Sequence, residues 1–214
     1  MFFVRRAASA LALALTAAAP ASAGVGDLLV APTRLVLDGR RSTELVLNNI
    51  GDEPATYRIS VEFRHMKPDG TLEEVKDPTP AEQAAADMIV YAPRRVTLAP
   101  HEPQTIRIAA RAPQGLADGE YRVHLLLRAI PAPEPVVPSD GEKPQGVQLR
   151  LIPIYGVTIP VIVRLGNLDA KAAIGDVKLE TFNGKPAVGL ELSRTGTRST
   201  FGDIRVYKPG IKTP

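Results

Sequence analysis

Apolar and polar residues alternate along most of this chain, in short runs separated by turn-forming residues. A period of two places successive side chains on opposite faces of a strand, so that one face can be buried. The alternation predicts strands over residues 28–37, 42–48, 55–64, 88–91, 95–98, 104–110, 120–130 and 147–164. Turn signals about every 8–12 residues, without a long helical period, favour an antiparallel β-sandwich over an α/β fold.

Turn and cap residues punctuate this pattern at defined places. Asp38-Gly39 suits a tight hairpin turn between the first two predicted strands. Residues 79–86 form the one predicted helical segment, with Thr79 as its N-cap and Glu82 three residues later. The sequence therefore predicts an all-β domain with a single short helix.

A tyrosine follows a second corner signal. Asp118-Gly119 precedes Tyr121 at the start of the strand over residues 120–130. This arrangement is typical of the tyrosine corner of an immunoglobulin-like sandwich. An ordinary boundary between a loop and a strand is the alternative.

The run over residues 145–164 is the longest apolar β-patterned segment, and it follows a proline-rich stretch predicted to be an extended, mobile loop. Pro153 and Pro160 cannot donate to a sheet ladder, so we expect an edge strand. A long apolar edge promotes aggregation unless it is covered or used for pairing. Such an edge also permits self-association.

Alternation divides the side chains of this strand between two faces. Val147, Leu149 and Leu151 project to one face, and Gln148 and Arg150 project to the other. Such a strand can lend its backbone ladder and a row of apolar side chains to an incomplete partner sheet. The alternative is that these side chains fill the chain's own core, and both can hold for different parts of the strand.

The chain continues into a second module after a boundary at residues 165–167. Asn183-Gly184 is a strong hairpin signal. Strands are predicted over residues 174–182, 187–192 and 204–207. A sandwich needs about seven strands, so this module either borrows strands or belongs to a truncated gene product, and we favour truncation. The predicted organisation is a leader (1–23), an immunoglobulin-like domain (24–165) and an incomplete second β-sandwich domain (166–214).

The N-terminus has the pattern of a secretion signal. Arg5 and Arg6 precede an apolar stretch over residues 7–20, and Ala21-Ser22-Ala23 suits a cleavage site. The apolar stretch is too short for a stable membrane-spanning helix, so a membrane anchor is the weaker alternative. We expect an exported mature protein that begins at Gly24 and has no membrane insertion.

Composition excludes several classes of function. Loss of Arg5 and Arg6 lowers the net charge from +3 to +1. The sequence contains no basic stripe with interleaved aromatic residues, so it gives no indication of nucleic-acid binding. The chain has no cysteine, and its three histidines are scattered, so no transition-metal spacing is present and no cofactor is predicted. No nucleophile elbow or phosphate loop is found either. His124 is interpreted as a packing residue and Asp118-Gly119-Glu120 as a turn, so no catalytic residue is predicted.

Arg34 is the one cation of an otherwise apolar segment, residues 31–37. A buried arginine is costly unless it is paired, and its planar guanidinium suits a carboxylate. The alternative is an exposed arginine on the solvent face of an edge strand.

Four segments, in this order, resemble the periplasmic pilus-assembly chaperones of the chaperone-usher pathway. The first is PTRLVL (32–37), and the second is Asn48 or Asn49 with the following YRIS segment (57–60). The third is the proline-containing strand over 89–100 with its QTIRI sequel (104–108), and the fourth is LADGEY through AIP (116–131). The resemblance covers about residues 28–164.

This resemblance implies two immunoglobulin-like domains that cap fimbrial or pilus subunits in the periplasm, before delivery to an outer-membrane usher. The subunits of this family lack a strand, which the chaperone donates. The donated strand corresponds here to residues 147–157, and the side chains implied to fill the subunit groove are Val147, Leu149, Leu151, Pro153, Tyr155 and Val157. Arg34 matches the arginine that anchors the subunit's C-terminal carboxylate.

The sequence departs from the family in three ways. The second cleft cation aligns with Pro160, which carries no charge, one residue is added between Pro93 and Leu98, and the second domain lacks its latter half. A two-cation clamp is therefore not predicted. A clientless structural or adhesive immunoglobulin-like module of the envelope is the alternative function, and a hydrolase on a sandwich scaffold is a third.

Overall fold

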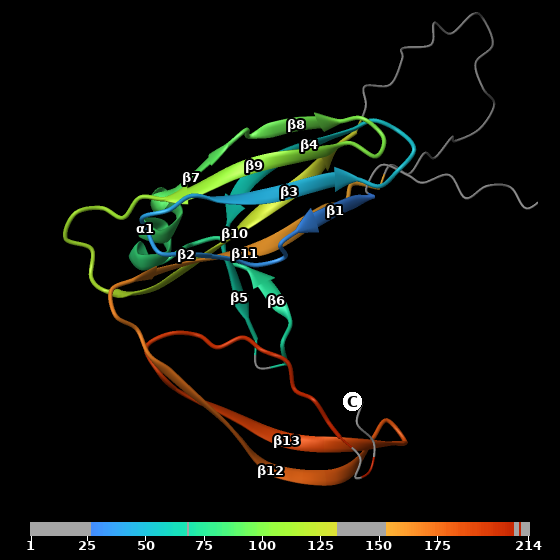
Figure 1. Cartoon of the computed structure of the whole chain (residues 1–214), viewed down its shortest axis with the longest axis vertical. Coiled ribbons are helices and arrows are strands. Elements are labelled where there is room, and N and C mark those ends of the chain that lie inside the picture. The colour runs from blue at the N-terminus through green and yellow to red at the C-terminus, as the bar shows by residue number, and fades with distance from the viewer. Residues whose placement is uncertain (1–26, 68, 132–152, 208–209, 211–214) are drawn as a thin grey trace, which may run out of the picture.

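A computed structural model describes residues 27–67, 69–131, 153–207 and 210, and these form an almost entirely β structure (Figure 1). The four-stranded sheet of the sandwich has the order β1 (Leu28–Ala31), β3 (Thr43–Asn49), β9 (Pro103–Ala110), β7 (Ile89–Ala92). The five-stranded sheet has the order β2 (Leu35–Leu37), β11 (Gly156–Leu165), β10 (Gly119–Ile130), β4 (Ala55–Glu62), β8 (Arg95–Leu98). The predicted leader and the proline-rich residues 132–146 lie outside the described residues.

The core lies between these two sheets and follows the predicted alternation. Val123, Leu125 and Leu127 of β10 point inward, and each is at most 1% exposed. Tyr57 and Ile59 of β4 are buried on the same side of the sheet, as predicted. The strands therefore form because every second side chain leaves water, which contributes about 1.5–3 kcal/mol for each fully buried large apolar residue.

The first predicted strand is in fact two strands in different sheets, so the predicted hairpin at Asp38-Gly39 is wrong. β1 pairs with β3 in the four-stranded sheet, whereas β2 pairs in parallel with β11 in the other. Pro32, which has no N–H for a ladder, lies in the bend where the chain leaves one sheet for the other. Asp38 Oδ1 accepts hydrogen bonds from the backbone N–H groups of Arg40 and Arg41, so the turn is held locally.

The helix and its cap are confirmed. Helix α1 (Pro80–Met88) begins after Thr79, whose Oγ1 accepts a hydrogen bond from the N–H of Glu82 at 3.3 Å. The Glu82 carboxylate in turn accepts from the N–H of Thr79 at 2.7 Å. This reciprocal pair satisfies two N–H groups that a helix start leaves without intrahelical partners.

The tyrosine corner is confirmed as well. The hydroxyl of Tyr121 donates to the carbonyl of Ala117 at 2.8 Å, which ties the start of β10 to the preceding loop. This contact is the hydrogen bond that defines the motif in immunoglobulin-like sandwiches.

Removal of this hydroxyl isolates the contribution of the corner to stability. We expect Tyr121→Phe to lower the free energy of unfolding by about 1 kcal/mol, because the ring stays in place and one hydrogen bond is lost. Denaturant unfolding of the two purified proteins measures the difference. Equal midpoints would show that the hydrogen bond contributes nothing to stability.

Two hairpins extend from the sandwich. β5 (Arg64–Met66) and β6 (Leu72–Glu74) form a short one that the sequence patterns did not separate from β4. β12 (Ala170–Phe182) and β13 (Lys185–Gly196) form a long one, joined by Asn183 and Gly184, whose φ angles of 51° and 74° are those of a type I′ turn. The Asn-Gly hairpin prediction is thus confirmed, and Figure 1 shows the long hairpin below the sandwich.

The predicted strand over residues 204–207 is wrong. Residues 201–207 have no regular secondary structure, and they are exposed. A short apolar run becomes a strand only where a neighbouring strand accepts its ladder, and within the described residues no strand pairs with it. Among all the residues that the structure describes, no helix is long and apolar enough to cross a membrane.

Candidate functional site

Three arginines lie together on the outer face of the five-stranded sheet, at the end facing the β12–β13 hairpin. We call Arg34, Arg122 and Arg164 the arginine cluster. Arg34 directly precedes β2, and the parallel register of Leu35 with Val161 places it beside Pro160 of β11. Arg122 and Arg164 belong to β10 and β11.

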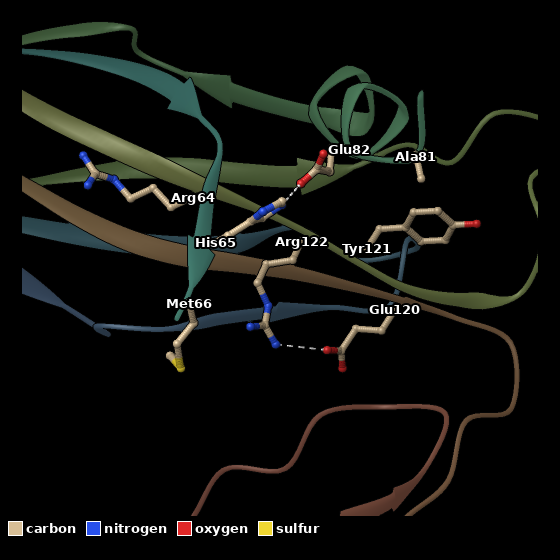
Figure 2. A pocket seen from close by; sticks show the side chains of 8 residues that line it. All are labelled: Arg64, His65, Met66, Ala81, Glu82, Glu120, Tyr121 and Arg122. Carbon is tan, nitrogen blue, oxygen red and sulfur yellow. Dashed lines mark hydrogen bonds and ion pairs between the residues drawn. The ribbon is translucent and has the colours of Figure 1, made fainter. Parts of the chain in front are cut away.

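Glu120 is the carboxylate that the cluster shares. It lies directly opposite Arg164 in the β10–β11 register, and its Oε2 is 3.0 Å from Nε of Arg164. Its Oε1 is 3.2 Å from Nη2 of Arg122, an ion pair drawn in Figure 2. One carboxylate therefore serves two guanidinium groups.

The environment of Glu120 favours its ionised form. Partial burial raises its pKa, but hydrogen bonds from Ser199, together with the hydrogen bond and charge of Arg164, outweigh burial and hold the pKa at about 2, below its ordinary 4.5. A carboxyl group with a lowered pKa stabilises the fold above its unfolded pKa, and this stabilisation is lost as pH falls towards the folded pKa.

This shift predicts a pH-dependent effect of Glu120→Gln. We expect the variant to be less stable than the wild type above pH 4.5, and we expect the difference to shrink as pH falls towards 2. Denaturant unfolding at a series of pH values measures it. A stability difference that does not change with pH would show that the glutamine destabilises the fold through packing and not through the loss of charge.

Arg34 is half-buried and makes no ion pair within the described residues. Its pKa is lowered by burial and by the charges of Arg122 and Arg164, and Glu120 offsets only part of this. Three guanidinium groups thus gather around a single carboxylate, so the cluster keeps a net positive charge. An anion, and a planar carboxylate in particular, is the ligand that such an arrangement favours.

Residues that follow β13 contact the cluster. Ser199 donates its N–H to Oε2 of Glu120 at 3.0 Å, and its carbonyl accepts from Nη2 of Arg164 at 2.9 Å. Its hydroxyl accepts from Nη2 of Arg34 at 3.3 Å, and the guanidinium of Arg34 lies 4.9 Å from the ring centre of Phe201. The chain segment beyond the long hairpin thus returns to the sandwich.

The edge of β11 beside this cluster is partly open. β2 covers β11 only at Val161–Val163, so residues 156–160 pair on one side, with β10. The ladder with β10 continues upstream, since the N–H of Ala129 donates to the carbonyl of Tyr155 at 2.9 Å. The predicted edge strand is therefore present over 156–160, whereas Val161–Val163 lie between β10 and β2 in the interior of the sheet.

The predicted strand-donating residues fall into three groups. Pro153 and Tyr155 are exposed, and Tyr155 is 56% exposed. Val157 is half-buried against the chain's own core, so the own-core alternative holds for this side chain. Val147, Leu149 and Leu151 lie outside the described residues.

His124 is 4% exposed, as its interpretation as a packing residue predicts. It lies between Glu62 and Pro160 in register, and its Nδ1 has no hydrogen-bond partner. Desolvation, reinforced by Arg122, lowers its pKa. In the described part of the chain, no group of three or more His, Cys, Asp or Glu residues could hold a metal ion.

A groove of about 440 Å³ adjoins the cluster between β5, the start of α1 and β10 (Figure 2). Its lining includes Arg64, His65 and Glu82, the last two in contact through their side chains, and it reaches Glu120 and Arg122. The groove is thus lined by both basic and acidic side chains.

Sequence reasoning identified Arg34 but missed the other members of the site. The turn interpretation includes Glu120, and neither Arg122 nor Arg164 belongs to a predicted motif. The alternation in β10 and β11 could have placed Glu120, Arg122 and Arg164 on the outer face. Their proximity to Arg34 depends on the β2–β11 pairing, which no local pattern indicates. The missing charge at Pro160 is thus accompanied by two cations nearby.

No protein-family model matches this chain, and no curated protein shows a significant match. Among solved structures, the chain is similar to the chaperone DraB of E. coli, with 18% identity over 84% of this chain and 88% of that chain and a TM-score of 0.46. It is similar to the SafB chaperone of Salmonella enterica, solved in complex with the SafA pilin, with 17% identity, coverage of 81% and 84%, and a TM-score of 0.45. A PapD-like domain of human CEP192 is also similar, with 14% identity, coverage of 78% and 100%, and a TM-score of 0.40. Several further similar structures are chaperones of fimbriae or pili.

Proposed function

We propose that this chain is a periplasmic chaperone that binds fimbrial or pilus subunits by strand donation and hands them to an outer-membrane usher. One observation carries the proposal: a net positive arginine cluster, in which Arg34 makes no ion pair within the described residues, lies at the end of an open sheet edge. The four sequence segments that resemble the pilus-assembly chaperones support it, and the leader supports export.

The open edge supplies the backbone part of the binding. A subunit that lacks a strand exposes a hydrophobic groove and unpaired N–H and C=O groups. A donated strand completes the ladder of that subunit and places alternate side chains in its groove. The candidates for these side chains are Val147, Leu149, Leu151, Pro153 and Tyr155.

The arginine cluster supplies the anchor and fixes the direction of the bound strand. β11 begins at Gly156 and runs towards Pro160, and Arg34 lies beside Pro160. A subunit strand whose C-terminal carboxylate reaches Arg34 therefore runs in the same direction as β11. This is the parallel arrangement that β2 already has with β11 further along the same edge.

Arg122 and Arg164 complete the electrostatic part. Each is paired with Glu120, so they do not offer a full charge to a ligand. They nevertheless keep the site positive around Arg34 and disfavour a cationic occupant. In this proposal, Arg34 is the direct anchor, and its two neighbours compensate for the uncharged Pro160.

A pull-down from the periplasm of the source cell, with induced expression of the neighbouring genes, tests the proposal. The wild-type mature protein is expected to recover a small β-structured subunit with a free C-terminal carboxylate, and Arg34→Ala is expected to recover less of it. Arg58→Ala is a matched control, since Arg58 is an exposed arginine of β4. An empty wild-type sample would contradict the proposal and favour a clientless envelope module.

A further inference from the structure

We propose that residues 197–201 are an internal cap on the arginine cluster, which a client's carboxylate displaces from Arg34. The inference rests on the proposed function and adds a regulatory contact to it. It comes from the observation that the position expected for the client's terminus already has an occupant, contributed by this chain itself. In Figure 1 this segment leaves β13 and passes between the hairpin and the sandwich.

The cap has a backbone layer that is held firmly. Ser199 bridges the Glu120–Arg164 pair, because its N–H donates to the carboxylate at 3.0 Å and its carbonyl accepts from the guanidinium at 2.9 Å. Both hydrogen bonds involve a charged partner, and such bonds are stronger than neutral ones. The segment therefore stays at the cluster even when its side chains move.

The side-chain layer covers Arg34 and is held weakly. The hydroxyl of Ser199 is 3.3 Å from Nη2 of Arg34, which is long for a hydrogen bond. The ring of Phe201 lies under the guanidinium at 4.9 Å, but this side chain is 79% exposed. A cation–π contact at an exposed site is at the weak end of its range.

The difference in charge between the cap and a client's carboxylate decides which of the two binds Arg34 more tightly. Ser199 and Phe201 are neutral, so they leave the charge of Arg34 uncompensated. A carboxylate forms charge-assisted and bidentate hydrogen bonds with the same guanidinium. A neutral cap therefore shields Arg34 in the free protein and yields to a free C-terminus, while it opposes weaker neutral ligands.

The two layers allow the cap to be opened without release of the segment. Phe201→Ala removes the ring over Arg34 and keeps the Ser199 bridge. Ser199→Ala removes the hydroxyl, with its contacts to Arg34 and, at 3.5 Å, to Nη2 of Arg164, and keeps the two backbone hydrogen bonds. Tyr207→Ala is the control, because Tyr207 is an exposed aromatic residue six positions after Phe201 that makes no hydrogen bond or cation–π contact with the arginine cluster within the described residues.

The probe is a short synthetic peptide with alternating apolar and polar residues and a free C-terminal carboxylate, compared with its C-terminal amide by calorimetric titration. We expect Phe201→Ala to bind the free acid about two- to fivefold more tightly than the wild type, the change that corresponds to loss of one exposed cation–π contact. Ser199→Ala is expected to act in the same direction, and Tyr207→Ala to change nothing. The gain is expected to vanish when Arg34→Ala is added.

Two results overturn the inference in distinguishable ways. If the wild type prefers the free acid and Phe201→Ala binds it equally or more weakly, the cap is refuted and the proposed function stands. If neither the wild type nor Phe201→Ala prefers the free acid over the amide, the carboxylate anchor fails, and the cap fails with it.

Discussion

Replacement of Arg34 by alanine is expected to weaken client binding by about ten- to a hundredfold. A hydrogen bond to a charged partner contributes about 1.5–3 kcal/mol, and each 1.4 kcal/mol is a factor of ten in affinity. The client's carboxylate loses this partner, and Arg122 and Arg164 cannot replace it fully, because each is already paired with Glu120. Titration of the purified client into wild-type and variant chaperone measures the loss.

The control separates a specific anchor from a general effect of positive charge. Arg58→Ala removes one positive charge from the five-stranded sheet, but Arg58 is an exposed residue of β4, away from the end of the β11 edge. We expect it to leave the affinity within a factor of two. Equal losses in Arg34→Ala and Arg58→Ala would contradict a specific anchor, and so would an amidated client that binds as tightly as the free acid.

Introduction of aspartate at Leu149 is expected to have the second large effect, a loss of client binding by more than about a hundredfold. The proposed strand donation places this side chain in an apolar groove, where a carboxylate without a partner costs several kcal/mol. Gln148→Asp is the matched control, since the alternation of a strand predicts that this neighbouring side chain projects to the opposite face. Its effect on affinity is expected to be small.

The unfolding of the free Leu149→Asp protein separates the two alternatives for this side chain. A cooperative unfolding transition with an unchanged midpoint assigns the Leu149 side chain to client binding, because the fold of the free chaperone then does not depend on this side chain. A lost or strongly lowered transition assigns it to the chain's own core and contradicts strand donation at this position. Equal binding losses in Leu149→Asp and Gln148→Asp would contradict the proposed alternation.

Local signals in the sequence predicted local structure well. The Thr79 cap, the Asn183-Gly184 hairpin and the Tyr121 corner each depend on residues within a few positions of one another. The alternation over residues 55–64 and 120–130 also predicted which side chains are buried, because strand geometry fixes the face of every second residue.

Non-local pairing explains the errors. Residues 28–37 form one largely apolar run, so the sequence pattern could not show that β1 and β2 belong to different sheets. The apolar residues at 204–207 have the composition of a strand, but within the described residues no neighbour accepts their ladder. A register between distant strands is decided by packing across the whole sandwich.

The same reason limited the prediction of the site. Arg34 stood out because a cation interrupts an apolar run, which is visible in the sequence alone. The Glu120–Arg164 pair depends on the β10–β11 register, and the contact of Ser199 depends on the path of the chain after β13. No local sequence pattern indicates either of these contacts.

Amide hydrogen exchange of the chaperone, free and bound to its purified client, tests strand donation most directly. Strand donation makes new backbone hydrogen bonds along one edge, so the account predicts added protection of alternate amides upstream of Pro160, over residues 147–159. Protection of β8, the edge strand on the far side of the same sheet, is expected to stay unchanged. Binding without new protection over residues 147–159 would contradict the account, whatever the affinity.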